Sequence, residues 1–195
     1  MAIHLLNNPV DLNEKVSSRR RFLKQMLCGS LLAVTDIEEA SAILRPSSLH
    51  KTLALENCHT GEKIKLTYFE RGRYIKPALR EINYLLRDYN NDNVHQIDPA
   101  LLDQLYDVKL MLGTHKPFHI ISGYRSPSTN AIMRKHHHGV AKDSLHMQGR
   151  AIDIQIQGLD TRRIRNAALA MQRGGVGYYA QSDFVHLDTG DFRTW

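Results

Sequence analysis

The sequence predicts an α+β fold, a small antiparallel β-sheet with packed helices. Three observations support this prediction. Two stretches in the middle of the chain carry apolar residues at helical spacing, residues 151–156 alternate strictly between apolar and polar, and short apolar runs lie near the end. A period near 3.6 residues indicates a helix against a core, and a period of two indicates a strand. The order, helices first and then strands with one helix between them, favours segregated helices and sheet.

The first 42 residues are typical of an export signal. Ser18-Arg19-Arg20-Arg21-Phe22-Leu23-Lys24 matches the twin-arginine pattern, a short apolar stretch follows, and Ala40-Ser41-Ala42 forms an A-x-A cleavage pattern. We expect residues 1–42 to be recognised by the twin-arginine export machinery, which delivers the protein to the periplasm. An ordinary basic helix start is the alternative. No apolar run reaches the roughly 18–20 residues of a membrane-spanning helix, so we expect no stable membrane insertion.

Residues 43–195 are then expected to form one domain, with a linker at 43–50. Two strand-like runs, Lys51–Glu56 and Lys63–Tyr68, flank His59-Thr60-Gly61-Glu62. Those four residues carry turn chemistry, and the pair of runs predicts a β-hairpin.

Two helices are predicted after the hairpin. Pro77 suits the first turn of a helix that extends to Tyr89. Asp98 is the expected N-cap of a second helix that extends to Leu112, and Gly113 is its expected stop. Six further elements complete the prediction: strands at 118–121, 151–156, 176–179 and 184–187, and helices at 126–135 and 160–173.

Composition and charge limit the partners and the kinds of metal site that this protein can have. The net charge of +6 favours an anionic partner, either nucleic acid or cell-wall polymer, although many soluble proteins are equally basic. No glycine loop that could cradle phosphate occurs, and no aromatic–basic pattern supports nucleic-acid binding. The two cysteines, Cys28 and Cys58, are too few for a thiolate zinc site. Any metal site must therefore use histidines and carboxylates.

The densest chemical signal is the segment from Ser144 to Asp153. His146 is expected in a loop, and Asp153 follows on the non-core face of a strand. Gly149 between them permits a tight backbone path that brings both side chains to one point. His186 lies on the last predicted strand. Two histidines and one carboxylate, with a position left for water, commonly hold catalytic zinc, so we expect one Zn²⁺ per chain.

Strand alternation places Asp188 on the same face as His186 and Asp183 on the other. Asp188 could orient His186 or accept a proton from the bound water. Face geometry makes Asp188 the first candidate for the general base, with Asp183 second. Arg125 follows a strand, where a fixed guanidinium can hold a substrate carbonyl or carboxylate and share the charge of an oxyanion. Ser122 and Tyr124 of the same motif are further candidates for substrate contact.

Four motifs occur in a fixed order along the chain: Ser122 to Pro127, Ser144-x-His146-x-x-Gly149-x-Ala151-x-Asp153, Gly174-Gly175-Val176-Gly177-Tyr178-Tyr179, and Phe184-Val185-His186-x-Asp188-x-Gly190. As an ordered group they closely resemble the peptidoglycan peptidases of the D-Ala-D-Ala metallopeptidase clan, and most closely the murein endopeptidase K type, over about residues 45–195. The Hedgehog signalling domain shares that fold. The resemblance implies that His146, Asp153 and His186 bind zinc, and that Arg125 contacts substrate or stabilises the transition state.

The resemblance also implies the function, a zinc-dependent endopeptidase that hydrolyses the peptide cross-links of peptidoglycan. The expected partners are peptidoglycan peptide stems, and we expect a monomer. Carboxypeptidases of the clan usually carry a histidine where this chain has Phe184, the D-alanyl-D-alanine dipeptidases a glutamate where it has Asp183, and Hedgehog-type domains a glutamate where it has Ala180. The general base therefore does not carry over from the clan. A D-alanyl-D-alanine carboxypeptidase, a non-catalytic zinc-containing wall-binding module and a metal-free wall protein stay as alternatives.

Overall fold

The computed structural model of the chain describes residues 49–136 and 139–195. The predicted export signal at 1–42 and most of the predicted linker lie outside these residues. Within the described ranges, no helix is both long and apolar enough to cross a membrane.

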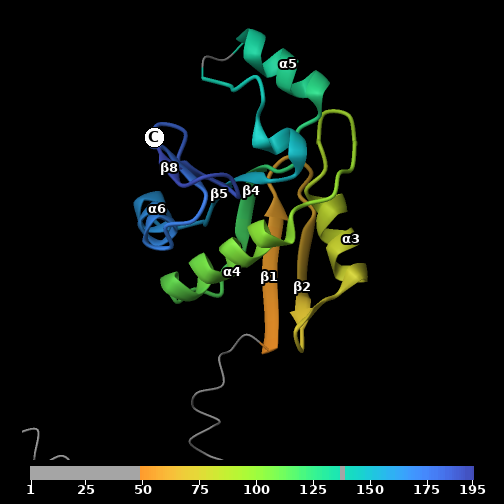
Figure 1. Ribbon diagram of the computed structural model, residues 1–195, viewed down its shortest axis with the longest axis vertical. Helices are drawn as coiled ribbons and strands as arrows, with labels where there is room; N and C mark the ends of the chain where they lie inside the picture. Colours follow the sequence, from red (N-terminus) through yellow and green to blue (C-terminus); the bar gives the residue numbers. More distant parts are fainter. Residues whose placement is uncertain (1–48, 137–138) are drawn as a thin grey trace, which may run out of the picture. The chain divides into compact units, whose positions relative to one another are not determined.

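Within the described residues, eight strands form one sheet in the order β3-β2-β1-β4-β5-β7-β6-β8. The strands are β1 (His50–Asn57), β2 (Lys63–Glu70), β3 (Arg73–Tyr74), β4 (Phe118–Ser122), β5 (Ala151–Gln155), β6 (Gly175–Tyr179), β7 (Phe184–Asp188) and β8 (Arg193–Thr194). The described helices are α3 (Lys76–Leu85), α4 (Pro99–Leu112), α5 (Pro127–His136) and α6 (Thr161–Ala170), with a short 3₁₀ helix, η2 (Leu145–Gln148); Figure 1 labels these four α-helices and five of the strands.

The α+β prediction is confirmed, and the prediction of a small antiparallel sheet needs correction. The hairpin of β1 and β2 is antiparallel as expected, but β4 pairs with β1 in parallel and β8 pairs with β6 in parallel. The chain between β1 and β4 contains α3 and α4, which is long enough for a crossover that returns it in the same direction. β8 has only two residues and therefore carries no periodic signal in the sequence.

Helix α4 has both predicted ends. The Asp98 side chain accepts a hydrogen bond from the backbone N–H of Ala100, and Gly113 has a left-handed φ of 59°. Helix α3 instead ends at Leu85, four residues before the predicted end at Tyr89. The side chain of Asp88 accepts a hydrogen bond from the backbone N–H of Asn90, and such local bonds compete with helix continuation.

The core lies on the face of the sheet that the helices cover. Helix α4 packs on β1 and on α6, and α6 packs on β6 and β7; Figure 1 shows α4 lying across β1. Ile152 and Ile154 of β5 are fully buried in this core. Because successive side chains of a strand point to opposite faces, Asp153 between them faces away from the core. The fold thus directs one carboxylate toward the other face of the sheet, where the predicted site residues gather.

Candidate metal centre

Strand register brings site residues into one row across the sheet. Ser122 of β4 pairs with Asp153 of β5, Asp153 pairs with His186 of β7, and His186 pairs with Gly177 of β6. Paired residues in adjacent antiparallel strands have neighbouring side chains on one face. The row therefore places two of the predicted ligands, Asp153 and His186, side by side.

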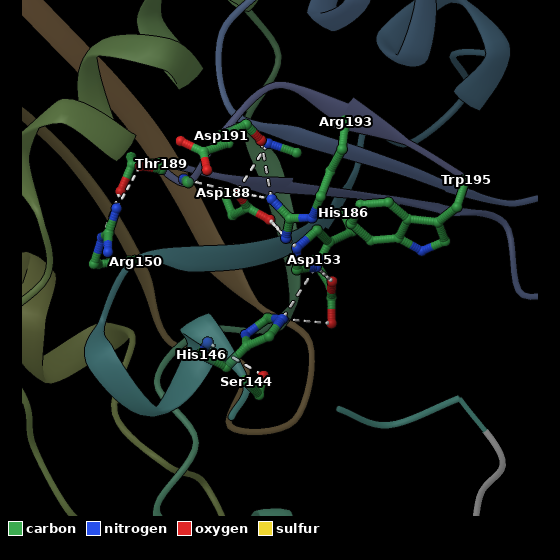
Figure 2. Close-up of polar contacts among 12 residues, drawn as sticks. Ser144, His146, Arg150, Asp153, His186, Asp188, Thr189, Asp191, Arg193 and Trp195 are labelled. Atoms are coloured by element: carbon green, nitrogen blue, oxygen red, sulfur yellow. Dashed lines mark hydrogen bonds and ion pairs between the residues drawn. The ribbon is translucent and has the colours of Figure 1, made fainter. Parts of the chain in front are cut away.

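The three predicted metal ligands meet at one point (Figure 2). One potential ligand atom from each of His146, Asp153 and His186 lies within 4.8 Å of the other two. Nε2 of His146 is 3.2 Å from Nδ1 of His186 and 3.3 Å from Oδ2 of Asp153. Nδ1 of His186 is 2.9 Å from Oδ1 of Asp153.

His146 reaches this point from the 3₁₀ helix η2. The Ser144 side chain accepts a hydrogen bond from the backbone N–H of His146, and Gly149 ends the turn with a left-handed φ of 66°. A Cβ at Gly149 would overlap the carbonyl oxygen of Gln96, so the close backbone approach requires glycine. The tight turn lets the imidazole lie over β5 from a position seven residues before Asp153.

Hydrogen bonds fix which nitrogen of each imidazole faces the cluster. Nδ1 of His146 lies 2.8 Å from the carbonyl oxygen of Gly123, which can only accept a hydrogen bond. Nε2 of His186 lies 3.0 Å from Oδ2 of Asp188. Each ring donates its proton outward and turns its other nitrogen toward Asp153. Two nitrogen lone pairs and one carboxylate that converge on a point fit a divalent cation, which is the arrangement of a catalytic zinc site.

The carboxylates and imidazoles of the cluster shift each other's pKa values. Burial opposes ionisation of Asp153, but His146 and His186 hold the pKa of its carboxyl well below the usual range. Burial also opposes protonation of His186, yet its hydrogen bonds to Asp153 and Asp188 raise the pKa of the imidazole to about 9. Without a metal, a second proton on His186 would supply the positive charge that the two carboxylates attract.

Asp188 lies next to the cluster and is fully buried. Oδ2 contacts His186, and Oδ1 accepts hydrogen bonds from the backbone N–H groups of Gly175 and Gly190. Burial raises the pKa of the Asp188 carboxyl, but these hydrogen bonds and Arg193 together hold it well below the usual range. Of the two roles considered for Asp188, this geometry suits the orientation of His186.

The structure does not bring Asp183 to the cluster. Asp183 has a left-handed φ of 52°, and its Oδ1 accepts a hydrogen bond from the hydroxyl of Thr161 at 2.8 Å. It lines a separate hollow with His119 and Gln155. A turn before β7 thus directs this carboxylate away from the metal ligands.

Arg125 is buried beside the cluster with unused hydrogen-bonding capacity. Its guanidinium donates to Asn130 and Ser122, and one nitrogen lies 3.6 Å from Oδ2 of Asp153. Among the described residues, none accepts a hydrogen bond from its buried Nε. Two further residues were predicted to contact substrate. The hydroxyl of Ser122 accepts a hydrogen bond from Arg125. The ring of Tyr124 stacks on His95 with ring centroids 4.7 Å apart.

A cleft of about 520 Å³ is lined by the three predicted metal ligands and Arg125. Its apolar and aromatic lining residues include Met133, Val140, Leu145, Tyr179, Phe184 and Trp195. Asp143, Arg193 and Trp195 belong to this cleft although the sequence motifs do not mark them. The Phe192–Trp195 segment lacks a periodic pattern, and the only available signal was its position shortly after the His186 motif.

Comparison with known proteins gives a consistent result. Residues 45–195 match the Peptidase_M15_2 family, described as peptidoglycan L,D-endopeptidase MepK. The chain is 46% identical to the protein of that name from Escherichia coli strain K12 over 173 residues, which cover 85% of this chain and 94% of the relative. It is 36% identical to a probable peptidoglycan L,D-endopeptidase MepK from Haemophilus influenzae over 180 residues, 91% of this chain and 95% of the relative.

Proposed function

This chain belongs to the Peptidase_M15_2 family of peptidoglycan endopeptidases, and from that premise we propose how it cleaves its substrate. The chain is an enzyme that hydrolyses peptide bonds in peptidoglycan. We propose that the reaction depends on one Zn²⁺ ion held by His146, Asp153 and His186. The observation that carries this proposal is the convergence of their ligand atoms within 4.8 Å of one another, in residues that line the cleft.

When bound, zinc would supply an activated water at neutral pH and polarise the carbonyl of the scissile bond. Asp153 provides the negative charge that holds the cation, and the two imidazoles provide neutral nitrogen ligands. Asp188 keeps the His186 ring turned so that Nδ1 faces the cluster. The cleft is lined by these polar residues together with apolar and aromatic side chains, which suits a peptide main chain bound beside the metal.

Arg125 is proposed to bind the carbonyl oxygen of the scissile bond as that oxygen gains negative charge. Its guanidinium is held by Asn130 and Ser122, lies 3.6 Å from Asp153 and lines the cleft. Because these contacts fix the donor before the reaction, it needs little rearrangement to stabilise the developing charge.

We propose that the cleaved bond joins two diaminopimelate residues. The relatives are named L,D-endopeptidases, and a cross-link between two diaminopimelate residues joins an L centre to a D centre. A cross-link between D-Ala and diaminopimelate joins two D centres. We further propose that the protein reaches this substrate in the periplasm after twin-arginine export, and that it acts as a monomer.

The test is digestion of purified muropeptides by the zinc-loaded protein, followed by mass spectrometry. Two cross-linked dimers are offered separately, one of each type of cross-link. We expect the wild type to cleave the dimer with the diaminopimelate–diaminopimelate bond and the chelated protein to cleave neither. If His146→Ala and Asp153→Ala release the same products at the wild-type rate, the metal-dependent mechanism is wrong.

A further inference from the structure

A buried carboxylate lies behind the metal ligand His186. Asp188 is 0% exposed, and a charged group in that position is costly unless other groups pair with it. His186 and two backbone N–H groups, those of Gly175 and Gly190, already contact its oxygens. Arg193 adds a permanent positive charge beside Asp188.

Arg193 makes a paired contact with Asp188 (Figure 2). One terminal nitrogen of the guanidinium lies 3.1 Å from Oδ1, and the other lies 2.6 Å from Oδ2. Two parallel N–H···O bonds between a guanidinium and a carboxylate are stronger and more directional than a single contact. Glycine at 175 and at 190 leaves the space for it, because a Cβ at either position would meet the Arg193 side chain.

The backbone around Arg193 is held in the sheet. β8 pairs in parallel with β6, with Gly175 opposite Arg193. The backbone N–H of Tyr178 donates to the carbonyl oxygen of Trp195 at 2.9 Å. The Trp195 ring centroid lies 5.1 Å from the Arg193 guanidinium, and its Nε1–H donates to the hydroxyl of Tyr179. Arg193 is therefore fixed at its backbone and along its side chain.

We propose that Arg193 is a positioning residue for the metal ligand His186 and acts on it through Asp188. The chain of contacts runs from the guanidinium to the carboxylate and from the carboxylate to Nε2 of the imidazole. Arg193 holds the Asp188 carboxylate in place, Asp188 accepts a hydrogen bond from Nε2 of His186, and Nδ1 then faces His146 and Asp153. This inference rests on the proposed metal site for its consequence, but the orientation of the His186 ring can be measured without metal.

The effect should be large because groups that orient a metal ligand commonly contribute 10–100-fold to metal affinity or activity. Without Arg193, the Asp188 carboxylate keeps its backbone donors but loses its cation. The carboxylate would then no longer be held by two parallel bonds, which weakens its hold on the ring of His186.

The experiment uses the full chain with Arg193→Gln and Arg193→Lys. Zinc affinity is measured by competition with a chelator. The hydrogen bond from Nε2 of His186 to Asp188 is followed by the ¹⁵N chemical shift of Nε2 in metal-free protein. We expect Arg193→Gln to bind zinc about 10–100-fold more weakly and to change the Nε2 shift, because Asp188 is no longer held in place. Arg193→Lys should lose less zinc affinity than Arg193→Gln, because a lysine keeps the charge but cannot make two parallel bonds. Arg162→Gln is the matched control, since Arg162 is exposed and, among the described residues, forms its ion pair with Asp160.

Each outcome decides the proposal. If Arg193→Gln retains wild-type zinc affinity and the wild-type His186 spectrum, Arg193 does not position His186. If Arg193→Gln fails to fold, the test rests on Arg193→Lys. Unchanged zinc affinity in Arg193→Lys contradicts the proposal. If the wild type binds no zinc while Arg193→Gln still changes the His186 spectrum, the metal-dependent function fails and the role of Arg193 stands.

Discussion

Nε2 of His146 lies 3.2 Å from Nδ1 of His186, although the two residues are 40 positions apart in the chain. Each ring turns its second nitrogen outward, to the carbonyl oxygen of Gly123 in one case and to Asp188 in the other. Two nitrogen acceptors that face each other repel unless a proton or a cation lies between them. We therefore expect a cation to bind between the two rings and Asp153.

Metal content is the first measurable consequence. We expect the wild type to retain about one zinc per chain after dialysis, and His146→Ala or Asp153→Asn to retain almost none, because three ligands are the minimum for a catalytic zinc site. Metal analysis by mass spectrometry gives the stoichiometry. His115→Ala is the control, because His115 is exposed and lies outside the cluster. Equal zinc content in the wild type and in both ligand variants would contradict the proposed zinc site.

Gly149→Ala should destabilise the protein more than Gly61→Ala does. Both glycines have a left-handed φ, of 66° and 72° respectively, which costs an alanine roughly 1–2 kcal/mol. At Gly149 the added Cβ would also overlap Gln96, whereas at Gly61 nothing lies within 4 Å. Urea denaturation of both variants measures the difference. Equal losses would show that the close approach at Gly149 contributes nothing.

Asp88→Asn should lower stability in a pH-dependent way. Burial opposes ionisation of Asp88, but hydrogen bonds from Ser126 and from other donors lower the pKa of the carboxyl below its unfolded value of about 4. A lowered pKa adds stability above the unfolded value, and this stability is lost as the pH falls through the folded value.

We therefore expect Asp88→Asn to cost roughly 1–3 kcal/mol at pH 7, and the gap to the wild type to close below a pH of about 4. The free energy of unfolding in urea at several pH values measures the gap. Glu81→Gln, which removes an exposed carboxylate, should change stability little at any pH. If the difference in the free energy of unfolding between the wild type and Asp88→Asn is the same at every pH, the lowered pKa of Asp88 does not contribute to stability.

Three carboxylate variants separate the possible general bases. Asp183→Asn should leave kcat unchanged, because Asp183 bonds to Thr161 away from the cleft. Asp188→Asn should weaken zinc binding, because it loosens His186. Asp143 also lines the cleft, and we expect Asp143→Asn to lower kcat by about 10²–10⁴-fold at unchanged zinc affinity if it accepts the proton. A large loss of kcat in Asp183→Asn would instead indicate that Asp183 is the general base.

Trp195→Ala should raise KM for cross-linked peptides, with a smaller loss of zinc affinity than Arg193→Gln, because the indole also packs on Arg193. The indole is 49% exposed, lines the cleft and lies with its centroid 5.2 Å from the ring of His186. An aromatic contact of roughly 0.5–1.5 kcal/mol corresponds to a change of up to about tenfold in KM. Phe192→Ala is the control, because Phe192 is equally exposed but does not line the cleft.

Gly177→Ala offers an independent check on Trp195. A Cβ at Gly177 would meet the indole and displace it, so this variant should raise KM in the same direction as Trp195→Ala. Steady-state kinetics on the isolated dimer measures both variants. Unchanged KM in both would show that the indole does not contact substrate.

The sequence by itself determined the local elements and the identity of the predicted ligands. Helix α4 begins and ends at the predicted cap residues because Asp98 and Gly113 act through bonds within a few positions. The alternation in β5 likewise assigned Ile152 and Ile154 to the core and Asp153 to the opposite face. These signals are local, and so a single sequence carries them.

Only the tertiary structure decided how the strands are ordered and what surrounds each ligand. The parallel pairings of β4 and β8 depend on where the chain returns to the sheet, which no short pattern encodes. The contact of Arg193 with Asp188 and the turn of Asp183 toward Thr161 follow from that arrangement. Hydrogen bonds act over about 3 Å in space, so residues distant in the sequence can make them only after the sheet has formed.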